Sequence, residues 1–188
     1  MMLGSRVVEF QRVIGSTEIT DGACEPQDTE AAIVGLVALL KDLRQRRGHL
    51  FIIGNGGSAG VASHAVTDFV NVGKLRATTL HDSALLTCMS NDYGYEAAFA
   101  QILSTVASPG DVLIAVSSSG QSKNIRNAAT TMRELGGTVI TLSGLKRDNP
   151  LRALGDVNIW LNSTDYGMVE IGHQFVLHNL ADRLRLGL

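Results

Sequence analysis

The sequence predicts an α/β protein with a doubly wound, five-stranded parallel sheet flanked by helices. Four short, largely apolar runs and a weaker fifth at residues 77–80 alternate with stretches long enough for helices, and turn-forming residues follow several of the runs. Strands that are apolar on both faces are typical of parallel sheets covered on both sides, and right-handed crossovers then give the doubly wound arrangement. We expect the strands at residues 50–53, 77–80, 111–116, 138–142 and 157–161.

Helices are expected before, between and after these strands. The first is well marked, because Asp28 is a favourable N-cap and the apolar residues after it, from Ile33 to Leu43, recur at helical spacing. Residues 1–27 are expected to form an N-terminal segment, loop-like at 15–27 and preceded by a short helix that packs on a partner chain. Residues 28–188 are expected to form one domain. The predicted helices span residues 28–47, 57–72, 83–90, 93–107, 121–135 and 169–186.

Composition excludes several classes of protein. The 188 residues are 45% hydrophobic and 18% charged, which fits a folded domain rather than a disordered chain. A net charge of −2 offers no basic field for nucleic acid, and no apolar run approaches the roughly 20 residues of a membrane span. Cys24 and Cys88 have no metal-like spacing and are expected as reduced thiols. With no signal-peptide pattern, we expect a cytoplasmic protein that binds neither nucleic acid nor membrane.

Two of the predicted strands end in segments suited to anion binding. Glycines let the backbone approach a ligand closely, and the N-terminus of the helix that follows favours negative charge. Hydroxyl groups bind phosphate without burying a lysine. A glycine turn also serves a purely structural purpose, whereas three successive serines at a strand end have no packing value. The two segments are Gly54-Asn55-Gly56-Gly57-Ser58 and Ser117-Ser118-Ser119-Gly120-Gln121-Ser122.

Two predicted helices carry groups suited to acid–base chemistry or metal binding. His64 and Asp68 are four residues apart and share one helical face. Glu170 and His178 are eight residues apart on the last helix and also share a face. Polar stripes of this kind usually face solvent, but the last helix also has an apolar face. Two histidines and two carboxylates at helical spacing are suited to zinc or a similar divalent ion.

The combined motifs resemble the SIS (sugar isomerase) family, and within it the phosphoheptose isomerases. The resemblance covers roughly residues 30 to 185 and includes GNGGSA, HDSALLTCMSND, GDVLIAVSSSGQS and VITLSG. It implies a five-stranded sheet of flavodoxin-like layout and isomerisation of sedoheptulose 7-phosphate to D-glycero-D-manno-heptose 7-phosphate. By position, it implies that Asn55, Gly56, Gly57, Ser58, Ser117, Ser118, Ser119 and Ser122 contact the phosphate or sugar, and that Asp92 reaches the sugar hydroxyls.

Moving a proton between C1 and C2 requires a base and an acid. We assign Asp68 as the base and His178 as the acid, with His64 and Glu170 helping these two to hold zinc. Asp68 stands where the family has glutamate and Glu170 where it has glutamine. Glu170 is also expected to contact the substrate. A lone SIS domain further implies a homo-oligomer, a tetramer by resemblance, with active sites between subunits.

Three other functions share this fold. Relatives that bind the replication initiator DnaA keep the serines but lose the carboxylate and the last histidine, both of which this chain retains. Sugar-phosphate sensors carry a helix-turn-helix segment, for which the first 27 residues are too few and too poor in basic residues. The departures from the family at Asp68 and Glu170 are also compatible with an isomerase of another long-chain ketose phosphate.

Overall fold

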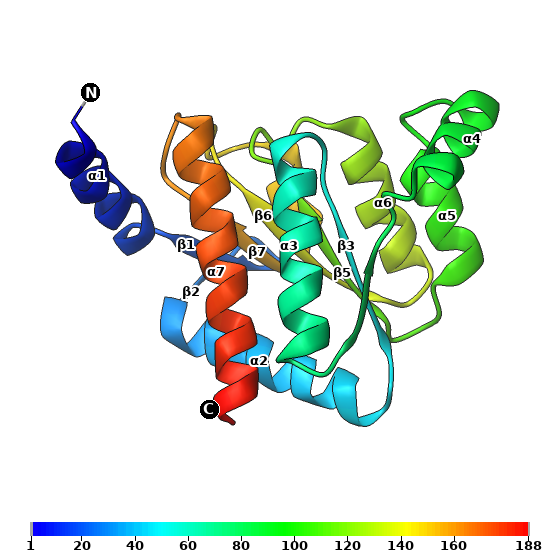
Figure 1. Ribbon diagram of the computed structural model, residues 1–188, viewed down its shortest axis with the longest axis horizontal. Helices are drawn as coiled ribbons and strands as arrows, with labels where there is room; N and C mark the ends of the chain where they lie inside the picture. Colours follow the sequence, from blue (N-terminus) through cyan, green and yellow to red (C-terminus); the bar gives the residue numbers. More distant parts are fainter. Residues whose placement is uncertain (1, 188) are drawn as a thin grey trace.

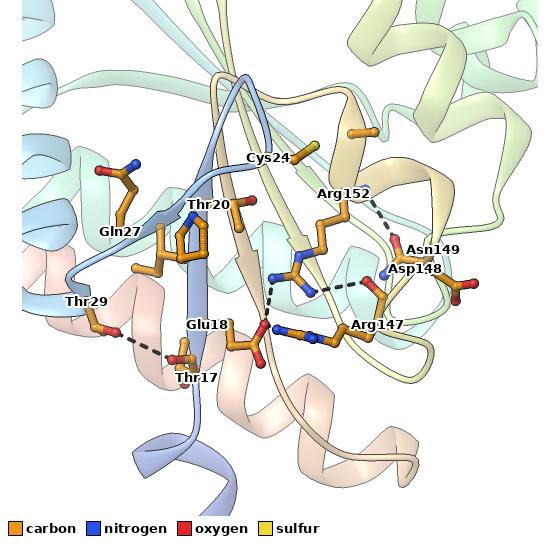
Figure 2. A pocket seen from close by; sticks show the side chains of 13 residues that line it. Thr17, Glu18, Thr20, Cys24, Gln27, Thr29, Arg147, Asp148, Asn149 and Arg152 are labelled. Carbon is orange, nitrogen blue, oxygen red and sulfur yellow. Dashed lines mark hydrogen bonds and ion pairs between the residues drawn. The ribbon is translucent and has the colours of Figure 1, made fainter.

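The computed structural model describes residues 2–187 and consists of a central sheet between two layers of helices (Figure 1). The strand order is β2-β1-β7-β6-β5-β3-β4. Five of these strands, from β7 to β4, pair in parallel, which confirms the predicted parallel sheet. The strands are β1 (Glu18–Asp21), β2 (Pro26–Gln27), β3 (His49–Ile53), β4 (Arg76–Thr79), β5 (Val112–Val116), β6 (Thr138–Ser143) and β7 (Val157–Trp160).

The loop predicted at residues 15–27 was wrong, because β1 and β2 lie within it. β1 runs antiparallel to β7 and extends the sheet, and β2 pairs antiparallel with β1. The hairpin between them is stabilised by Asp21, whose carboxylate accepts hydrogen bonds from the backbone N–H groups of Ala23 and Glu25. Strand β1 has only four residues, two of them buried, and is too short to show a clear alternation of apolar and polar residues in the sequence.

The helices agree with the predicted ones in number and order after residue 28, with shifted ends. The largest correction concerns the predicted helix at 93–107, which begins only at Ala98. Gly94 at φ +81° ends the preceding helix, and a turn separates the two. The helices are α1 (Leu3–Gly15), α2 (Thr29–Gln45), α3 (Gly57–Asn71), α4 (Ser83–Tyr93), α5 (Ala98–Val106), α6 (Lys123–Glu134), the 3-10 helix η1 (Pro150–Ala153) and α7 (Tyr166–Leu186).

Two hydrophobic cores lie on opposite faces of the sheet. One joins α2, α3 and α7 to strand residues such as Leu50 and Ile114. The other joins α5 and α6 to the alternate strand residues, among them Phe51 and Leu113. This alternation along β3 and β5 is what strands buried on both faces require. As a result, the carboxyl ends of the strands and the first turns of α3, α6 and α7 meet at one edge (Figure 1).

The N-terminal helix α1 confirms the predicted short helix. It projects beside the first turns of α7 (Figure 1), where Phe10 packs edge-to-face on Phe175 at 6.0 Å between ring centroids. Its outer face leaves Leu3, Val7 and Val8 exposed. Contact of this helix with a partner chain stays a prediction. None of the helices among residues 2–187 is long and apolar enough to cross a membrane.

Candidate active site

The first candidate loop, residues 54–58, joins β3 to α3. Gly56 adopts φ +54° as the N-cap of α3, and Ser58 is buried in the first turn. Asn55 does not point freely toward a ligand, because its side-chain amide forms two reciprocal hydrogen bonds with the amide of Asn124, each 2.9 Å long. The hydroxyl of Tyr95 donates a third hydrogen bond to the side-chain amide oxygen of Asn55 at 2.7 Å. The Asn55 side chain therefore fixes the loop to α6 and to the segment before α5.

A protein carboxylate covers the first turn of α3. A methyl group added at Gly57 would lie 2.3–2.4 Å from the carboxylate atoms of Glu170, so Glu170 on α7 rests directly against this glycine. The N-terminus of a helix favours negative charge. Glu170 thus already places a negative group where the sequence predicted a ligand anion, and a side chain at position 57 would require the Glu170 carboxylate to move.

The second candidate loop, residues 117–122, joins β5 to α6 and is called the serine loop below. Ser117 and Ser118 are buried at 5% and 4% exposure. The Ser117 hydroxyl lies 3.4 Å from that of Ser122, and Ser119 accepts a hydrogen bond from the backbone N–H of Gln121. The Ser118 hydroxyl has no hydrogen-bond partner among the described residues. An unpartnered buried hydroxyl costs stability unless a ligand satisfies it.

Gly120 sets the shape of the serine loop. It adopts φ +64°, and a methyl group there would lie 1.9 Å from the side-chain oxygen of Asn149. Asn149 is itself fixed, because its amide nitrogen donates to the Ser143 hydroxyl and its oxygen caps η1. The loop is therefore held against the end of β6 by contacts that only glycine permits.

A third group of residues lies farther along α3 and α7. His178 Nδ1 lies 2.9 Å from Asp68 Oδ2, and His64 Nε2 lies 3.4 Å from the same oxygen. Asp68 is 18% exposed at its side chain, whereas both imidazoles are more than half exposed. The structure thus brings together the predicted base, the predicted acid and one predicted metal ligand, although His178 is 110 residues from Asp68 in sequence.

These three residues fit a divalent cation. One ligand atom from each lies within 4.8 Å of the others, and two imidazole nitrogens with a carboxylate oxygen are ordinary zinc ligands. Glu170 is not part of this cluster in the described chain, so its place among the metal ligands stays a prediction. It lies eight residues before His178 on α7, about 12 Å along the helix axis, and contacts Gly57 instead.

Asp92 is also separate from both loops. It is exposed on α4, where its carboxylate accepts hydrogen bonds from Asn91 and Cys88. Its partners among residues 2–187 include no member of the first loop or the serine loop. The contact of Asp92 with sugar hydroxyls therefore stays a prediction.

Two histidines near the loops carry lowered pKa values. Burial lowers the pKa of His81, and its Nε2 accepts a hydrogen bond from the Gly54 backbone at 3.4 Å. Complete burial lowers the pKa of His173 to about 4, and its Nε2 donates to the Ser143 carbonyl. Sequence reasoning did not single out His81, although its position directly after β4 puts it at the ligand-bearing edge of the sheet.

Comparisons with known proteins identify the family of the chain. The family model described as SIS domain matches residues 23–144. The chain is 35% identical over 164 residues to phosphoheptose isomerase of Geotalea daltonii, covering 84% of this chain and 85% of that protein. It is 36% identical over 141 residues to the Mycobacterium tuberculosis enzyme of that name, covering 72% and 71%. The chain belongs to the phosphoheptose isomerase family.

A solved structure of a family member confirms the fold. Phosphoheptose isomerase from Neisseria gonorrhoeae superposes with a TM-score of 0.82 at 25% identity, over 97% of this chain and 96% of that one. This phosphoheptose isomerase family comprises sugar-phosphate isomerases, so the predicted family and its class of reaction are confirmed. The hairpin of β1 and β2 makes the sheet seven-stranded rather than five-stranded.

Proposed function

We propose that the protein isomerises a phosphorylated long-chain ketose to its aldose, with sedoheptulose 7-phosphate as substrate and D-glycero-D-manno-heptose 7-phosphate as product. The observation that carries the proposal is the 2.9 Å contact between Asp68 and His178. Proton transfer between neighbouring carbons requires an acid and a base that both reach the substrate, and this contact places the two side chains at one site. The family relationship supports the sugar-phosphate class of substrate.

The serine loop supplies the phosphate site in this proposal. Its buried hydroxyl at Ser118 lacks a partner, and the loop leads into the N-terminus of α6, where negative charge is favoured. The first loop has Glu170 against it, which disfavours a second anion. We therefore assign the substrate phosphate to the serine loop, and the sugar hydroxyls to the neighbourhood of Glu170 and Gly57.

Proton transfer falls to Asp68 and His178. Asp68 Oδ2 faces both histidines, while Oδ1 forms no hydrogen bond within residues 2–187 and is available to take a proton from C1 or C2. In the ketose-to-aldose direction, Asp68 takes the proton from C1 and returns it to C2, while His178 gives a proton to O2 and takes the proton of the C1 hydroxyl, so that the carbonyl moves from C2 to C1. His178 also protonates the ring oxygen during ring opening. A divalent ion held by His64, Asp68 and His178 would polarise the substrate carbonyl.

The distances favour an active site shared between two copies of the chain. Asp68 lies eleven residues beyond Gly57 on α3, about 16 Å along the helix axis. The acid–base pair therefore lies about three turns along α3 from the first loop, a separation that supports a site to which a second copy of the chain contributes. A homo-oligomer, a tetramer in our proposal, brings the serine loop and Glu170 of one copy to the histidine–aspartate group of another.

The direct test is turnover of sedoheptulose 7-phosphate by the purified protein, before and after chelation of divalent metal. We expect Asp68→Asn and His178→Ala each to lower kcat by about 10²–10⁴-fold, the usual contribution of a general acid or base. Asp42→Asn is the matched control, because Asp42 is an exposed helical carboxylate that also pairs with a basic residue. Loss of turnover on chelation would support the metal.

Absence of turnover by a folded wild-type protein would contradict the sedoheptulose assignment. Binding of the sugar phosphate without isomerisation would then indicate a binding protein of the same fold. Turnover of another ketose phosphate would retain the isomerase and change only its substrate. If the wild-type protein is active, mixing Asp68→Asn with Ser118→Ala tests the shared active site, because sites formed from two copies predict partial recovery of activity in mixed oligomers.

A further inference from the structure

A concave site lies at the edge of the sheet opposite the candidate loops, where β3 and β4 begin. It encloses about 200 Å³ and is lined by Arg44, Arg47, Gly48, Lys74 and Arg76. These residues come from the end of α2, the turn between α2 and β3, the turn between α3 and β4, and the first residue of β4. The proposed active site uses none of them. The site is therefore separate from the loops at the carboxyl ends of the strands.

The four basic side chains at this site have no acidic partner among the described residues. Elsewhere, arginines commonly pair with acids, as Arg183 does with Glu30 and Arg152 with Glu18. A buried acid at this end of the sheet, Asp111, accepts hydrogen bonds from the backbone N–H groups of His49 and Ser108. Four unpaired positive charges around one pocket repel each other, so an anion is the ligand that would stabilise them.

Two hydrogen bonds connect the turn before β3 with the turn before β4. The Arg44 guanidinium donates to the carbonyl of Gly73 at 3.1 Å, across to the turn before β4. The Arg76 guanidinium donates to the carbonyl of Arg47 at 2.8 Å, back to the turn before β3. Each guanidinium carries five N–H donors, so most remain available to a ligand. These bonds connect the two turns and leave the other guanidinium N–H groups and the positive charges available to a ligand.

The backbone conformation at two of these residues is unfavourable for their type. Arg47 adopts φ +58° and Lys74 φ +54°, in the left-handed region where glycine or asparagine is usual. Arg47 stands just after the C-cap of α2, a position that glycine commonly takes. Strain of this kind often marks a ligand site.

We propose that this pocket binds a small multivalent phosphate anion, such as a diphosphate group, either free or carried by a nucleotide. The four positive charges match several negative charges better than a single one, and the volume suits a phosphate-sized group rather than a macromolecule. Guanidinium groups pair with phosphate oxygens through parallel hydrogen bonds. The proposal does not depend on the proposed reaction, because it involves the other edge of the sheet.

The test is titration calorimetry of the metal-free protein with inorganic diphosphate, ATP and inorganic phosphate. Serine-loop binding is removed by saturating the protein with sedoheptulose 7-phosphate or by using Ser118→Ala. We expect diphosphate or ATP to bind more tightly than phosphate, with an affinity that weakens at least tenfold from 50 to 500 mM salt. Equal affinities for diphosphate and ATP would identify the phosphate groups as the part that is recognised. A higher affinity for ATP would show that the nucleotide is the ligand.

The variants Arg47→Asn and Lys74→Asn provide the sharper test. Asparagine tolerates the left-handed conformation, so each variant should keep or raise the melting temperature while weakening diphosphate binding at least fivefold. Arg46→Gln is the control, because Arg46 is the neighbouring arginine and already pairs with Asp42. Unchanged affinity in both variants, or no binding at millimolar diphosphate, would overturn the proposal. Tighter binding of a single-stranded oligonucleotide than of diphosphate would also overturn it.

Discussion

The first loop and the serine loop occupy equivalent places, since each follows a buried parallel strand and begins a helix, yet their polar groups are used differently. In the first loop, the Asn55 side chain is bound to Asn124 and Tyr95, and the Glu170 carboxylate covers Gly57. In the serine loop, the Ser118 hydroxyl is buried without a partner. The first loop therefore binds protein groups, whereas the serine loop retains capacity for a ligand.

This difference shows that glycine content alone does not identify a phosphate site. The first loop is the richer in glycine, and by sequence both loops are equally placed to receive an anion. What separates them is the satisfaction of hydrogen-bonding groups, which depends on residues far away in sequence. The predictions below test that distinction.

The largest effect is expected from Gly120→Ala. The new methyl group would meet Asn149 at 1.9 Å and the residue would keep φ +64°, so Asn149 and the start of η1 must shift. We expect a loss of about 3–5 kcal/mol in the free energy of unfolding, in the range of severe core changes. Gly56→Ala is the comparison, because open space surrounds that position and only backbone strain of about 1–3 kcal/mol applies. Equal losses in urea unfolding would contradict the difference.

Ser118→Ala should change affinity and stability in opposite directions. A hydrogen bond to a charged phosphate contributes about 1.5–3 kcal/mol, so affinity for the sugar phosphate should fall roughly 10–100-fold. Because the hydroxyl is buried without a partner, removing it should leave the ligand-free protein as stable or more stable. Calorimetric titration and thermal unfolding of the same preparation measure both. A variant that is less stable but binds normally would show that Ser118 is structural.

Acid should destabilise the protein through His173, the buried histidine that donates to the Ser143 carbonyl. The pKa of His173 is lowered to about 4 in the folded state by burial, below its ordinary value near 6.5, so protons bind preferentially to the unfolded chain. Its stabilising effect is complete above pH 6.5 and is lost as the pH falls toward 4. Between pH 7 and pH 5 we expect a loss of about 2 kcal/mol.

Urea unfolding at these two pH values measures this loss, with His173→Gln as the comparison. Burial also lowers the pKa values of His81 and His49, which add to the effect in the same direction and remain in the variant. The pH dependence should therefore shrink in His173→Gln without vanishing. An unchanged pH dependence would show that His173 does not contribute.

Tyr95→Phe should have the smallest effect. It removes the 2.7 Å hydrogen bond to Asn55 but leaves the reciprocal bonds with Asn124. We expect a loss of about 0.5–1.5 kcal/mol in unfolding free energy. If Asn55 is structural, affinity for the sugar phosphate should change less than twofold. A tenfold loss of affinity with normal stability would instead place the first loop in direct contact with the ligand.

The sequence predicted most of the fold because its strands are continuous apolar runs and its helices have regular spacing. It missed β1 and β2, whose few residues give too little periodicity, and it started the helix before β5 too early because Gly94 was not recognised as a helix end. At the site, the helical spacing of His64 and Asp68 was sufficient to predict their contact. The spacing of Glu170 and His178 does not by itself bring them together, since they lie about 12 Å apart along α7, and a shared ion stays a prediction.

The most direct test compares the binding of sedoheptulose 7-phosphate with that of sedoheptulose, in the wild-type protein and in Ser118→Ala. If the serine loop holds the phosphate, the wild-type preference for the phosphorylated sugar should fall about tenfold or more in the variant, with the affinity for sedoheptulose unchanged. A preference that is the same in both proteins would contradict the assignment of the phosphate to the serine loop.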